Sequence, residues 1–308
     1  MSRRGVKAPV AESRWARLLT ESRHPRSRGL DRMATSDIVG LLLDEDRLAL
    51  LAAARERPAI TRAANLAART LEQGGDVVLL GAGTSGRLAV LEAAECPPTF
   101  SSAPQRIRAL MAGGEGAVFR AVEGAEDRED VGSREGRRLR RQDLLIGISA
   151  SSVTPFVRGA LAAARAKGAA TTLLTCAPDP RLAALADVVV GIATGPEILT
   201  GSTRLKAGSA TKAVLNAITT AAMVRQGKAY ENLMVDLKQT SKKLEDRARR
   251  IVAAAARVSA ARAGALLASA GDVKTAIVIG RLGVDAAEAR RRLAKARGHV
   301  RAALDERD

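Results

Sequence analysis

One stretch, residues 76–100, constrains the fold of this chain more than any other. An apolar run at 77–80 breaks into a glycine-rich turn at 81–86, and apolar residues at helical spacing follow from Leu88. We expect Pro97-Pro98 to end that helix, because proline lacks the N–H that a helix interior needs. The order of strand, glycine turn and helix is typical of proteins that alternate strands with helices.

The glycine-rich turn has the features of an anion-binding site. Glycines let the backbone approach a ligand, the N–H groups of the first helical turn lack partners within the helix, and the helix dipole favours negative charge. Gly83 belongs to this turn, and Thr84 and Ser85 add two hydroxyl donors. Glu95 lies towards the far end of the same helix. A phosphate cradle and a carboxylate on one element indicate chemistry on a phosphorylated small molecule.

The three glycines of the turn also match the spacing found in dinucleotide-binding proteins, but this signal is weak alone. Dinucleotide binding needs an acidic residue at the end of the second strand, and here that strand leads into Ala112-Gly-Gly-Glu115. A second hydroxyl-rich turn follows the third strand and holds Ser149, Ser151, Ser152 and Thr154. Alone, it is equally well explained as a helix N-cap with spare serines. Together, the two turns favour one compact phosphate held from two sides.

Strands and helices alternate through the middle of the chain. We expect strands at 77–80, 107–111, 144–148, 171–175 and 188–192, and helices at 35–42, 44–55, 60–73, 118–125, 156–166, 182–186 and 205–226. This order predicts an α/β fold with a Rossmann-like three-layer arrangement, a parallel sheet flanked by helices on both faces. In such sheets ligands bind beyond the carboxyl ends of the strands, where both hydroxyl-rich turns fall.

The chain divides into three regions by pattern and charge. We expect a disordered basic tail at 1–19, a ligand-binding domain at 20–237 and a small C-terminal helical subdomain at 238–308. The net charge is +17, and the basic excess lies in the two flanks. Such a charge favours nucleic-acid binding, but aromatic residues make up only 2% of the chain, so stacking platforms are scarce. We therefore expect a solvated basic surface and no nucleic-acid partner.

The sequence also indicates the cellular compartment in which the protein is found. We find no apolar run long and uncharged enough to cross a bilayer, and no apolar signal-peptide core at the N-terminus. Cys96 and Cys176 form no disulfide framework, and Cys96 is expected to be a packed core thiol. The only histidines, His24 and His299, are far apart and suggest neither a triad nor a metal site. We expect a reduced cytoplasmic protein with no metal and no membrane partner.

Two glutamates are candidates for acid–base chemistry. Glu95 lies among small apolar residues near a helix end, where a purely structural role is less expected. Glu126 lies in a run of acidic residues, and such runs are usually solvated surfaces. The turn that leads to Lys206, with Ser202 and Thr203, is a third candidate for ligand binding, or another capped helix start.

Several short motifs follow one another along the chain. They are Thr20-Glu-Ser-Arg23, Asp44-Glu-Asp46, Gly81-Ala-Gly-Thr-Ser-Gly-Arg87, Glu95-Cys-Pro-Pro-Thr99, Val122-Glu-Gly-Ala-Glu-Asp127, Gly195-Pro-Glu197, Thr200-Gly-Ser-Thr-Arg204, Lys206-Ala-Gly208 and Asn232-Leu-Met-Val-Asp236. In this order they closely resemble motifs of the N-acetylmuramic acid 6-phosphate etherases, which belong to the sugar isomerase (SIS) superfamily. The resemblance runs from about Thr20 to the C-terminus, so it is far more specific than the glycine spacing.

The resemblance implies an SIS-type sheet, a cytoplasmic homodimer and no cofactor. The implied reaction cleaves the D-lactyl ether of N-acetylmuramic acid 6-phosphate to N-acetylglucosamine 6-phosphate and D-lactate, a step of cell-wall sugar recycling. In the open-chain sugar the C2 proton is α to an aldehyde, so a carboxylate can remove it. The C3 ether then leaves when an acid protonates its oxygen, and water adds back. One base and one acid are enough.

The matched motifs carry over the family's functional residues. Glu95 is implied to be the acid for the departing lactate, and an apolar setting that raises its pKa would suit that role. Glu126 is implied to be the second catalytic glutamate and is the expected base. The expected phosphate- and sugar-binding residues are Gly83, Thr84, Ser85, Ser149, Ser151, Ser152, Thr154, Glu197, Ser202, Thr203 and Lys206, of which Glu197 is expected to face the sugar.

The second turn departs from the family's pattern. There the family usually reads Ser-Gly-Arg-Thr-Pro, and here the chain reads Ser151-Ser-Val-Thr-Pro155. Ser152 places a side chain where glycine lets the backbone approach the phosphate, and a positive φ at this residue costs roughly 1 kcal/mol. Val153 replaces a cation. These changes favour weaker affinity or a shifted substrate range.

Three other functions fit part of the pattern. A non-catalytic sugar-phosphate sensor, as among the related glucokinase regulatory proteins, agrees with the altered turn, but the two glutamates argue against it. An aldose–ketose isomerase on the same fold needs a base at C2 and no acid at C3, so lactate release separates it from an etherase. A nucleotide-dependent oxidoreductase requires NAD(P) binding. We rank the etherase above all three.

Overall fold

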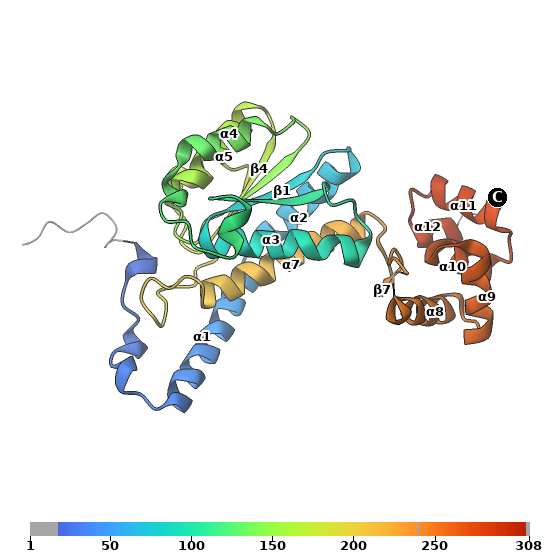
Figure 1. The fold of residues 1–308 in the computed structure, drawn as a ribbon, viewed down its shortest axis with the longest axis horizontal. Coiled ribbons are helices and arrows are strands. Elements are labelled where there is room, and N and C mark those ends of the chain that lie inside the picture. Colours follow the sequence, from blue (N-terminus) through green and yellow to red (C-terminus); the bar gives the residue numbers. More distant parts are fainter. Residues whose placement is uncertain (1–17, 240, 306–308) are drawn as a thin grey trace, which may run out of the picture.

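The centre of the molecule is a five-stranded parallel sheet (Figure 1). The computed structural model describes residues 18–239 and 241–305, so the expected tail at 1–19 lies almost wholly outside the described residues. The strands are β1 (Val77–Gly81), β2 (Ile107–Met111), β3 (Leu144–Ile148), β4 (Ala170–Thr175) and β5 (Val188–Gly191). Their order across the sheet is β2-β1-β3-β4-β5, and all neighbours are parallel. The predicted parallel α/β fold is confirmed.

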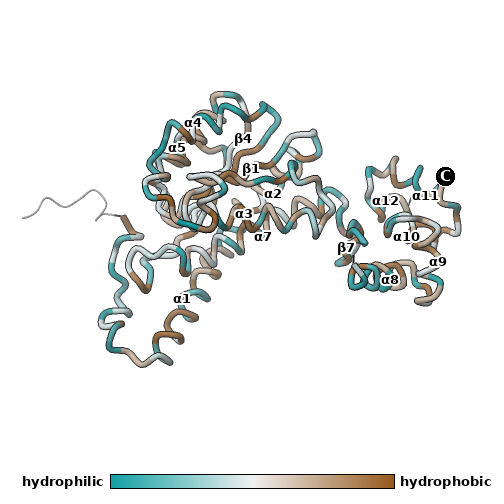
Figure 2. The backbone as a smooth tube through the Cα atoms, in the orientation of Figure 1, coloured by the Kyte–Doolittle hydropathy of each residue, from teal (hydrophilic) through white to brown (hydrophobic). Residues whose placement is uncertain are grey.

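Helices cover both faces of the sheet because its strands are apolar on both sides. On one face, Leu79 and Ile146 belong to an apolar cluster with α1 (Thr35–Arg55), α2 (Arg57–Glu72), α3 (Gly83–Phe100) and α7 (Lys206–Arg225). On the other face, Leu80 and Leu145 pack against α5 (Pro155–Ala166). The helices α4 (Glu129–Arg137) and α6 (Pro180–Ala183) complete this part of the chain. The hydrophobic stretches of the backbone trace gather along the strands and along α1 (Figure 2).

Some expected helices are wrong in extent. The N-terminal helices expected at 35–42 and 44–55 form the single helix α1, whose interior includes the acidic run at 44–46. Contrary to expectation, Pro97-Pro98 does not stop α3 before the prolines. Both prolines lie within its last turn, where they remove two N–H donors, and the helix ends two residues after Pro98. The short helix expected at 182–186 begins and ends earlier, as α6.

The segment expected to form a helix at 118–125 is mostly irregular. It lies between two single 3₁₀ turns, η5 (Glu115–Val118) and η6 (Ala125–Asp127). Gly124 has a φ of 72°, a left-handed conformation that interrupts any helix across this segment. Phe119, in this segment, is 89% exposed. Glu126 therefore lies on a short turn and not after a helix.

The C-terminal helices have an apolar core of their own. They are α8 (Lys242–Ala256), α9 (Ala260–Ala270), α10 (Val273–Leu282), α11 (Ala286–Lys295) and α12 (Val300–Asp305). In Figure 1 they stand apart from the sheet, joined to it through the two-residue strands β6 (Ala229–Tyr230) and β7 (Leu233–Met234). Within the described residues, no single helix is long and apolar enough to cross a membrane. Only α8 and α9 taken together have that length and apolarity, and they are bent by 106° relative to each other.

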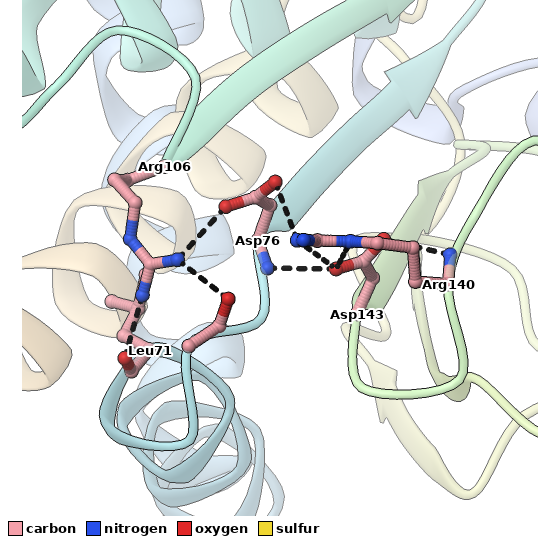
Figure 3. A network of polar contacts seen from close by, with 6 residues as sticks. Leu71, Asp76, Arg106, Arg140 and Asp143 are labelled. Atoms are coloured by element: carbon pink, nitrogen blue, oxygen red, sulfur yellow. Dashed lines mark hydrogen bonds and ion pairs between the residues drawn. The ribbon is translucent and has the colours of Figure 1, made fainter.

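A polar network holds the starts of β1 and β3 (Figure 3). Arg140 donates from Nη2 to Oδ2 of Asp76 and to Oδ1 of Asp143, both at 2.8 Å. Asp143 also accepts the N–H of Asp76 at 2.9 Å, and Arg106 donates to Oδ1 of Asp76 at 3.0 Å. Burial alone raises the pKa of Asp143, but the bonds from Arg140 and from backbone N–H groups outweigh burial and lower it. The network fixes the two strands that lead to the hydroxyl-rich turns.

Candidate active site

The two hydroxyl-rich turns lie side by side at the carboxyl edge of the sheet. The strand order changes direction between β1 and β3, because β2 lies on one side of β1 and β3 on the other. In open α/β sheets, ligands bind at such a point. Gly81 and Ile148 are register partners at the ends of β1 and β3. The turns that follow them, at 82–86 and 149–154, therefore begin next to each other.

The first turn needs its glycines. Gly83 has a φ of 54°, in the left-handed region. A Cβ on Gly86 would lie 2.8 Å from the carbonyl oxygen of Gly81, closer than such atoms approach, so only glycine lets α3 start this near β1. Ala82 is the N-cap of α3 and has no side-chain acceptor, which leaves the first-turn N–H groups to an anion. Thr84 and Ser85 lie half-buried in that turn.

Internal hydrogen bonds order the second turn. The hydroxyl of Ser149 lies 2.8 Å from that of Thr154, and the hydroxyl of Ser152 lies 2.6 Å from that of Thr175 on β4. Ser149 and Ser152 are buried, whereas Ser151 and Thr154 are half-buried. In the described part of the chain, the Thr154 hydroxyl caps none of the N–H groups of α5. The turn is therefore more than a helix N-cap.

Ser152 has the positive φ whose cost was anticipated from the sequence. Its φ is 59°, a left-handed conformation in which a side chain other than glycine is strained by about 1 kcal/mol. The hydrogen bond to Thr175 compensates part of this strain. The Ser152 side chain thus points to β4, and its backbone stays in the conformation that glycine normally supplies.

Glu197 has one buried carboxylate oxygen that lacks a hydrogen-bond partner among the described residues. The side chain is 1% exposed, its Oε1 accepts the N–H of Ala207 at 3.0 Å, and its Oε2 has no hydrogen-bond partner among the described residues. Burial raises the pKa of Glu197 more than the Ala207 N–H and the Lys206 charge lower it. A Cβ on Gly208 would lie 3.8 Å from Thr84, so the start of α7 meets the first turn.

Lys206 is held in an ion pair. Its Nζ lies 2.7 Å from Oε2 of Glu45, and both side chains are buried. Ser202 and Thr203, in the loop before α7, are half-buried. The N–H of Gly201 in the same loop donates to the carbonyl of Thr20 at 3.1 Å. The N-terminal segment therefore packs on the third turn.

Glu45 also accepts hydrogen bonds from side chains of that N-terminal segment. His24 donates from Nε2 to Oε2 of Glu45 at 3.2 Å, and Arg26 donates to Oε1 at 3.3 Å. The N–H of Arg26 donates to Nδ1 of His24 at 3.2 Å, which places the imidazole proton on Nε2. The sequence offered no signal for this cluster, because its members come from three separate parts of the chain.

The two predicted catalytic glutamates are both exposed, but they lie in different places. Glu126 is at the edge of the sheet that carries the cradle: Ala125 packs in one apolar cluster with Phe156 of α5, next to the second turn. Glu95 is ten residues after Ser85 on α3, which at 1.5 Å per residue is about 15 Å along the helix. The expectation that Glu95 has apolar surroundings is wrong for the single chain, in which its side chain is exposed.

Glu92, which the sequence did not single out, is the buried carboxylate of α3. Lys212 on α7 donates to its Oε2 at 2.5 Å, and the hydroxyl of Thr219 donates to its Oε1. Burial raises the pKa of the nearby Cys96 thiol to about 12, and the negative charge of Glu92 adds to this effect. The expectation that Cys96 is a packed core thiol is confirmed.

Known proteins match this chain along nearly its whole length. Residues 59–165 match the family model for the glucokinase regulatory protein N-terminal SIS domain. N-acetylmuramic acid 6-phosphate etherase from Serratia proteamaculans (strain 568) is 47% identical over 290 residues, which cover 93% of this chain and 98% of that protein. The protein of the same name from Salmonella typhimurium is 45% identical over 291 residues, or 94% and 98%. This chain therefore belongs to the N-acetylmuramic acid 6-phosphate etherase family.

Proposed function

We propose that this protein cleaves the D-lactyl ether of N-acetylmuramic acid 6-phosphate, producing N-acetylglucosamine 6-phosphate and D-lactate. Family membership supports the reaction. The observation that carries the proposal is the pair of hydroxyl-rich turns where the strand order reverses, with the buried carboxylate of Glu197 beside them. A phosphate and an adjoining sugar match this combination of donors and one acceptor.

The 6-phosphate binds between the two turns. Thr84 and Ser85 donate from the start of α3, and Ser151 and Thr154 donate from the start of α5, with Gly83 and Ser152 shaping the backbone of the two turns. Ser149 orients Thr154 through their hydroxyl contact at 2.8 Å. The N-termini of both helices add the favourable ends of their dipoles. The negative charge of the phosphate is thus stabilised by hydrogen bonds from neutral donors.

The sugar extends from the phosphate towards the third turn. Glu197 accepts a hydrogen bond from a sugar hydroxyl through Oε2, the oxygen that has no partner among the described residues. Ser202, Thr203 and Lys206 form the same wall of the site. Lys206 contributes positive charge while Glu45 holds its position. A site that binds the hydroxyl of a sugar through a buried carboxylate discriminates strongly against ligands that lack this hydroxyl.

The chemistry is an elimination followed by addition of water. Glu126 removes the C2 proton of the open-chain aldehyde, and the electrons form a C2–C3 double bond as the C3–oxygen bond breaks. Glu95 gives a proton to the departing lactate oxygen. Water then adds at C3 and a proton returns to C2, which yields N-acetylglucosamine 6-phosphate. A positioned acid or base typically contributes about 10²–10⁴ in rate.

We further propose that the protein is a cytoplasmic homodimer with no nucleic-acid or membrane partner. Exposed apolar side chains along α1 support a partner of the same kind: Val39 is 49% exposed, Leu43 65% and Leu50 45%. Figure 2 shows the same hydrophobic stretch on α1, which extends beyond the sheet. Burial of apolar side chains such as these is the main driving force of protein association.

Release of D-lactate from N-acetylmuramic acid 6-phosphate by the purified protein tests the proposal. We expect release by the wild type and by the control Asp127→Ala, which removes an exposed carboxylate next to Glu126. Glu95→Ala and Glu126→Ala should each lower the rate by about 10²–10⁴. Tight binding of the sugar phosphate without release would favour a sensor. Conversion of the sugar phosphate without lactate would favour an isomerase.

A further inference from the structure

The loop that carries Glu126 folds tightly over one glycine. Residues 113–127, here called the Glu126 loop, follow β2, and their backbone hydrogen bonds span four residues or fewer. Gly113 has a φ of 84°, and a Cβ on it would lie 3.0 Å from the Cβ of Ala117 and 3.1 Å from that of Val122. The loop therefore closes on this glycine, and Glu126 follows Val122 by four residues.

Arg87 supplies the hydrogen bonds that tie the Glu126 loop to α3. Its Nε donates to the carbonyl of Val118 and its Nη2 to that of Ala117, both at 2.9 Å. These two carbonyls end the 3₁₀ turn η5, and no backbone N–H of the described residues donates to them. Within the same residues, no other hydrogen bond joins the loop to a distant part of the chain. The planar fork of one guanidinium thus fastens the loop.

The same arginine lies next to the proposed phosphate cradle. Arg87 is two residues after Ser85 in α3, the helix that begins at Gly83. Met111, the last residue of β2, packs on the same part of α3, because a Cβ on Gly86 would lie 2.7 Å from its Cγ. A phosphate bound at the start of α3 and the loop held by Arg87 therefore share one support.

We infer, on the basis of the proposed function, that Arg87 is a positioning residue for Glu126. It holds the Glu126 loop where the carboxylate meets the C2 proton of a sugar whose 6-phosphate is bound at the start of α3. A base must lie within hydrogen-bond reach of the proton it removes, and a misplacement of about 1 Å can cost about 10² in rate. Because Nε and Nη2 are directed to the two loop carbonyls, the guanidinium acts on the loop and not on the phosphate.

Arg87→Ala separates positioning from phosphate binding. The variant should lower kcat for D-lactate release by about 10²-fold. Its affinity for N-acetylglucosamine 6-phosphate, measured by calorimetry, should match that of the wild type. The control Arg120→Ala removes an exposed arginine of the same loop and should change neither quantity. An unchanged kcat in Arg87→Ala, or a loss confined to binding, would overturn the inference.

A double variant shows whether Arg87 acts through Glu126. In Glu126→Gln the base is already absent, so the further change Arg87→Ala should cost little additional activity. If the two losses multiply in full, Arg87 acts independently of Glu126 and the inference fails. Arg87→Lys keeps the positive charge but cannot reproduce the fork, so its kcat should also fall. A kcat equal to that of the wild type in Arg87→Lys would show that charge alone matters, which contradicts the inference.

Hydrogen exchange tests the attachment of the loop without relying on activity. We expect the amides of the Glu126 loop to exchange faster in Arg87→Ala than in the wild type, while those of β1 and α5 stay equally protected. Equal exchange of the loop in both proteins would overturn the inference. If Arg87→Ala exchanges throughout the chain, it is misfolded, and Arg87→Lys should show the local change instead. If the wild type releases no lactate, the proposed function fails, and exchange still decides whether Arg87 holds the loop.

Discussion

The Nζ of Lys206 lies 2.7 Å from Oε2 of Glu45, and the two buried groups are 161 positions apart in the sequence. Lys206 begins α7 and Glu45 lies in the middle of α1, so the pair joins the N-terminal part of the chain to the edge of the site. A buried ion pair adds little net stability, but loss of one partner leaves an uncompensated charge in the interior. The structure around Glu197 therefore depends on Glu45.

Glu45→Ala should lower the free energy of unfolding by about 3–5 kcal/mol, the usual cost of breaking a buried pair. Urea denaturation followed by circular dichroism measures this change. The matched control is Asp44→Ala, which removes an exposed carboxylate that pairs with Arg26 at 3.3 Å. An exposed pair is worth about 0–1 kcal/mol. Equal losses in the two variants would contradict a special role for Glu45.

The same cluster predicts a dependence of stability on pH. Burial alone raises the pKa of Glu45, but the hydrogen bond and charge of Lys206, with a smaller effect of His24, lower it below its usual value. A carboxyl with a lowered folded-state pKa stabilises the fold above the unfolded-state pKa, about 4.3, and this stability disappears as the pH falls through the folded-state pKa.

Melting temperatures measured between pH 3 and pH 6 check this prediction. The wild type should lose stability steeply as the pH falls below about 4.3. Glu45→Gln should start less stable and decline less, because it cannot gain a proton at this position. Asp143, whose pKa is also lowered, contributes equally to both curves. Parallel curves for the two proteins would rule out Glu45 as a source of the slope.

Local patterns predicted the sheet well, because each strand is a short aliphatic run between turns. Two strands, 107–111 and 144–148, have the predicted bounds. The division of α1 at 44–46 was wrong for a non-local reason: three acidic residues in a row look like a helix start, and only the fold shows Glu45 meeting Lys206. Glu92 escaped notice for the same reason, since Lys212 is 120 positions away.

In the candidate site, too, local sequence patterns predicted some features, and others depend on contacts between residues far apart in the sequence. Both hydroxyl-rich turns were recognisable, because glycines and hydroxyls at strand ends are local features. Their closeness follows from the pairing of β1 with β3, which no local pattern specifies. The distance from Ser85 to Glu95 was implicit in helical spacing, whereas the exposure of Glu95 depends on what α3 packs against.

Ser152→Gly should strengthen phosphate binding without changing stability much. Removal of the left-handed strain gains about 1 kcal/mol, and loss of the hydrogen bond to Thr175 costs about the same. The backbone then approaches the phosphate freely, so KM should fall several-fold at unchanged kcat. The control Ser152→Ala loses the hydrogen bond and keeps the strain, so it should be less stable with no gain in KM. Identical KM values for both variants would contradict this account.

Asp143→Asn should destabilise the fold by about 2 kcal/mol, because hydrogen bonds to a charged group contribute about 1.5–3 kcal/mol and the amide keeps only some of them. Asp143 is 3% exposed and joins the start of β3 to Asp76 and Arg140. The control Asp246→Asn removes an exposed charge that pairs with Arg250 on α8. Urea denaturation should show little change for that control, and a similar loss in both would argue against the network.

Glu197→Gln should keep the fold and lose activity. The amide oxygen can still accept the N–H of Ala207, so the free energy of unfolding should stay near that of the wild type. The negative charge at the free oxygen is gone, and a hydrogen bond to a charged group is worth about 1.5–3 kcal/mol. We therefore expect kcat/KM for lactate release to fall about 10–100-fold.

The pH profile of kcat/KM separates the charge of Glu197 from its shape. Because burial raises the pKa of this carboxyl, the wild type should lose activity on the acid side at a pH above that expected for an exposed glutamate. Glu197→Gln lacks the titrating group, so that limb should disappear, whereas Glu197→Ala should also lose stability because the N–H of Ala207 loses its acceptor. An unchanged acid limb in Glu197→Gln would assign the titration to another group and remove Glu197 from the sugar site.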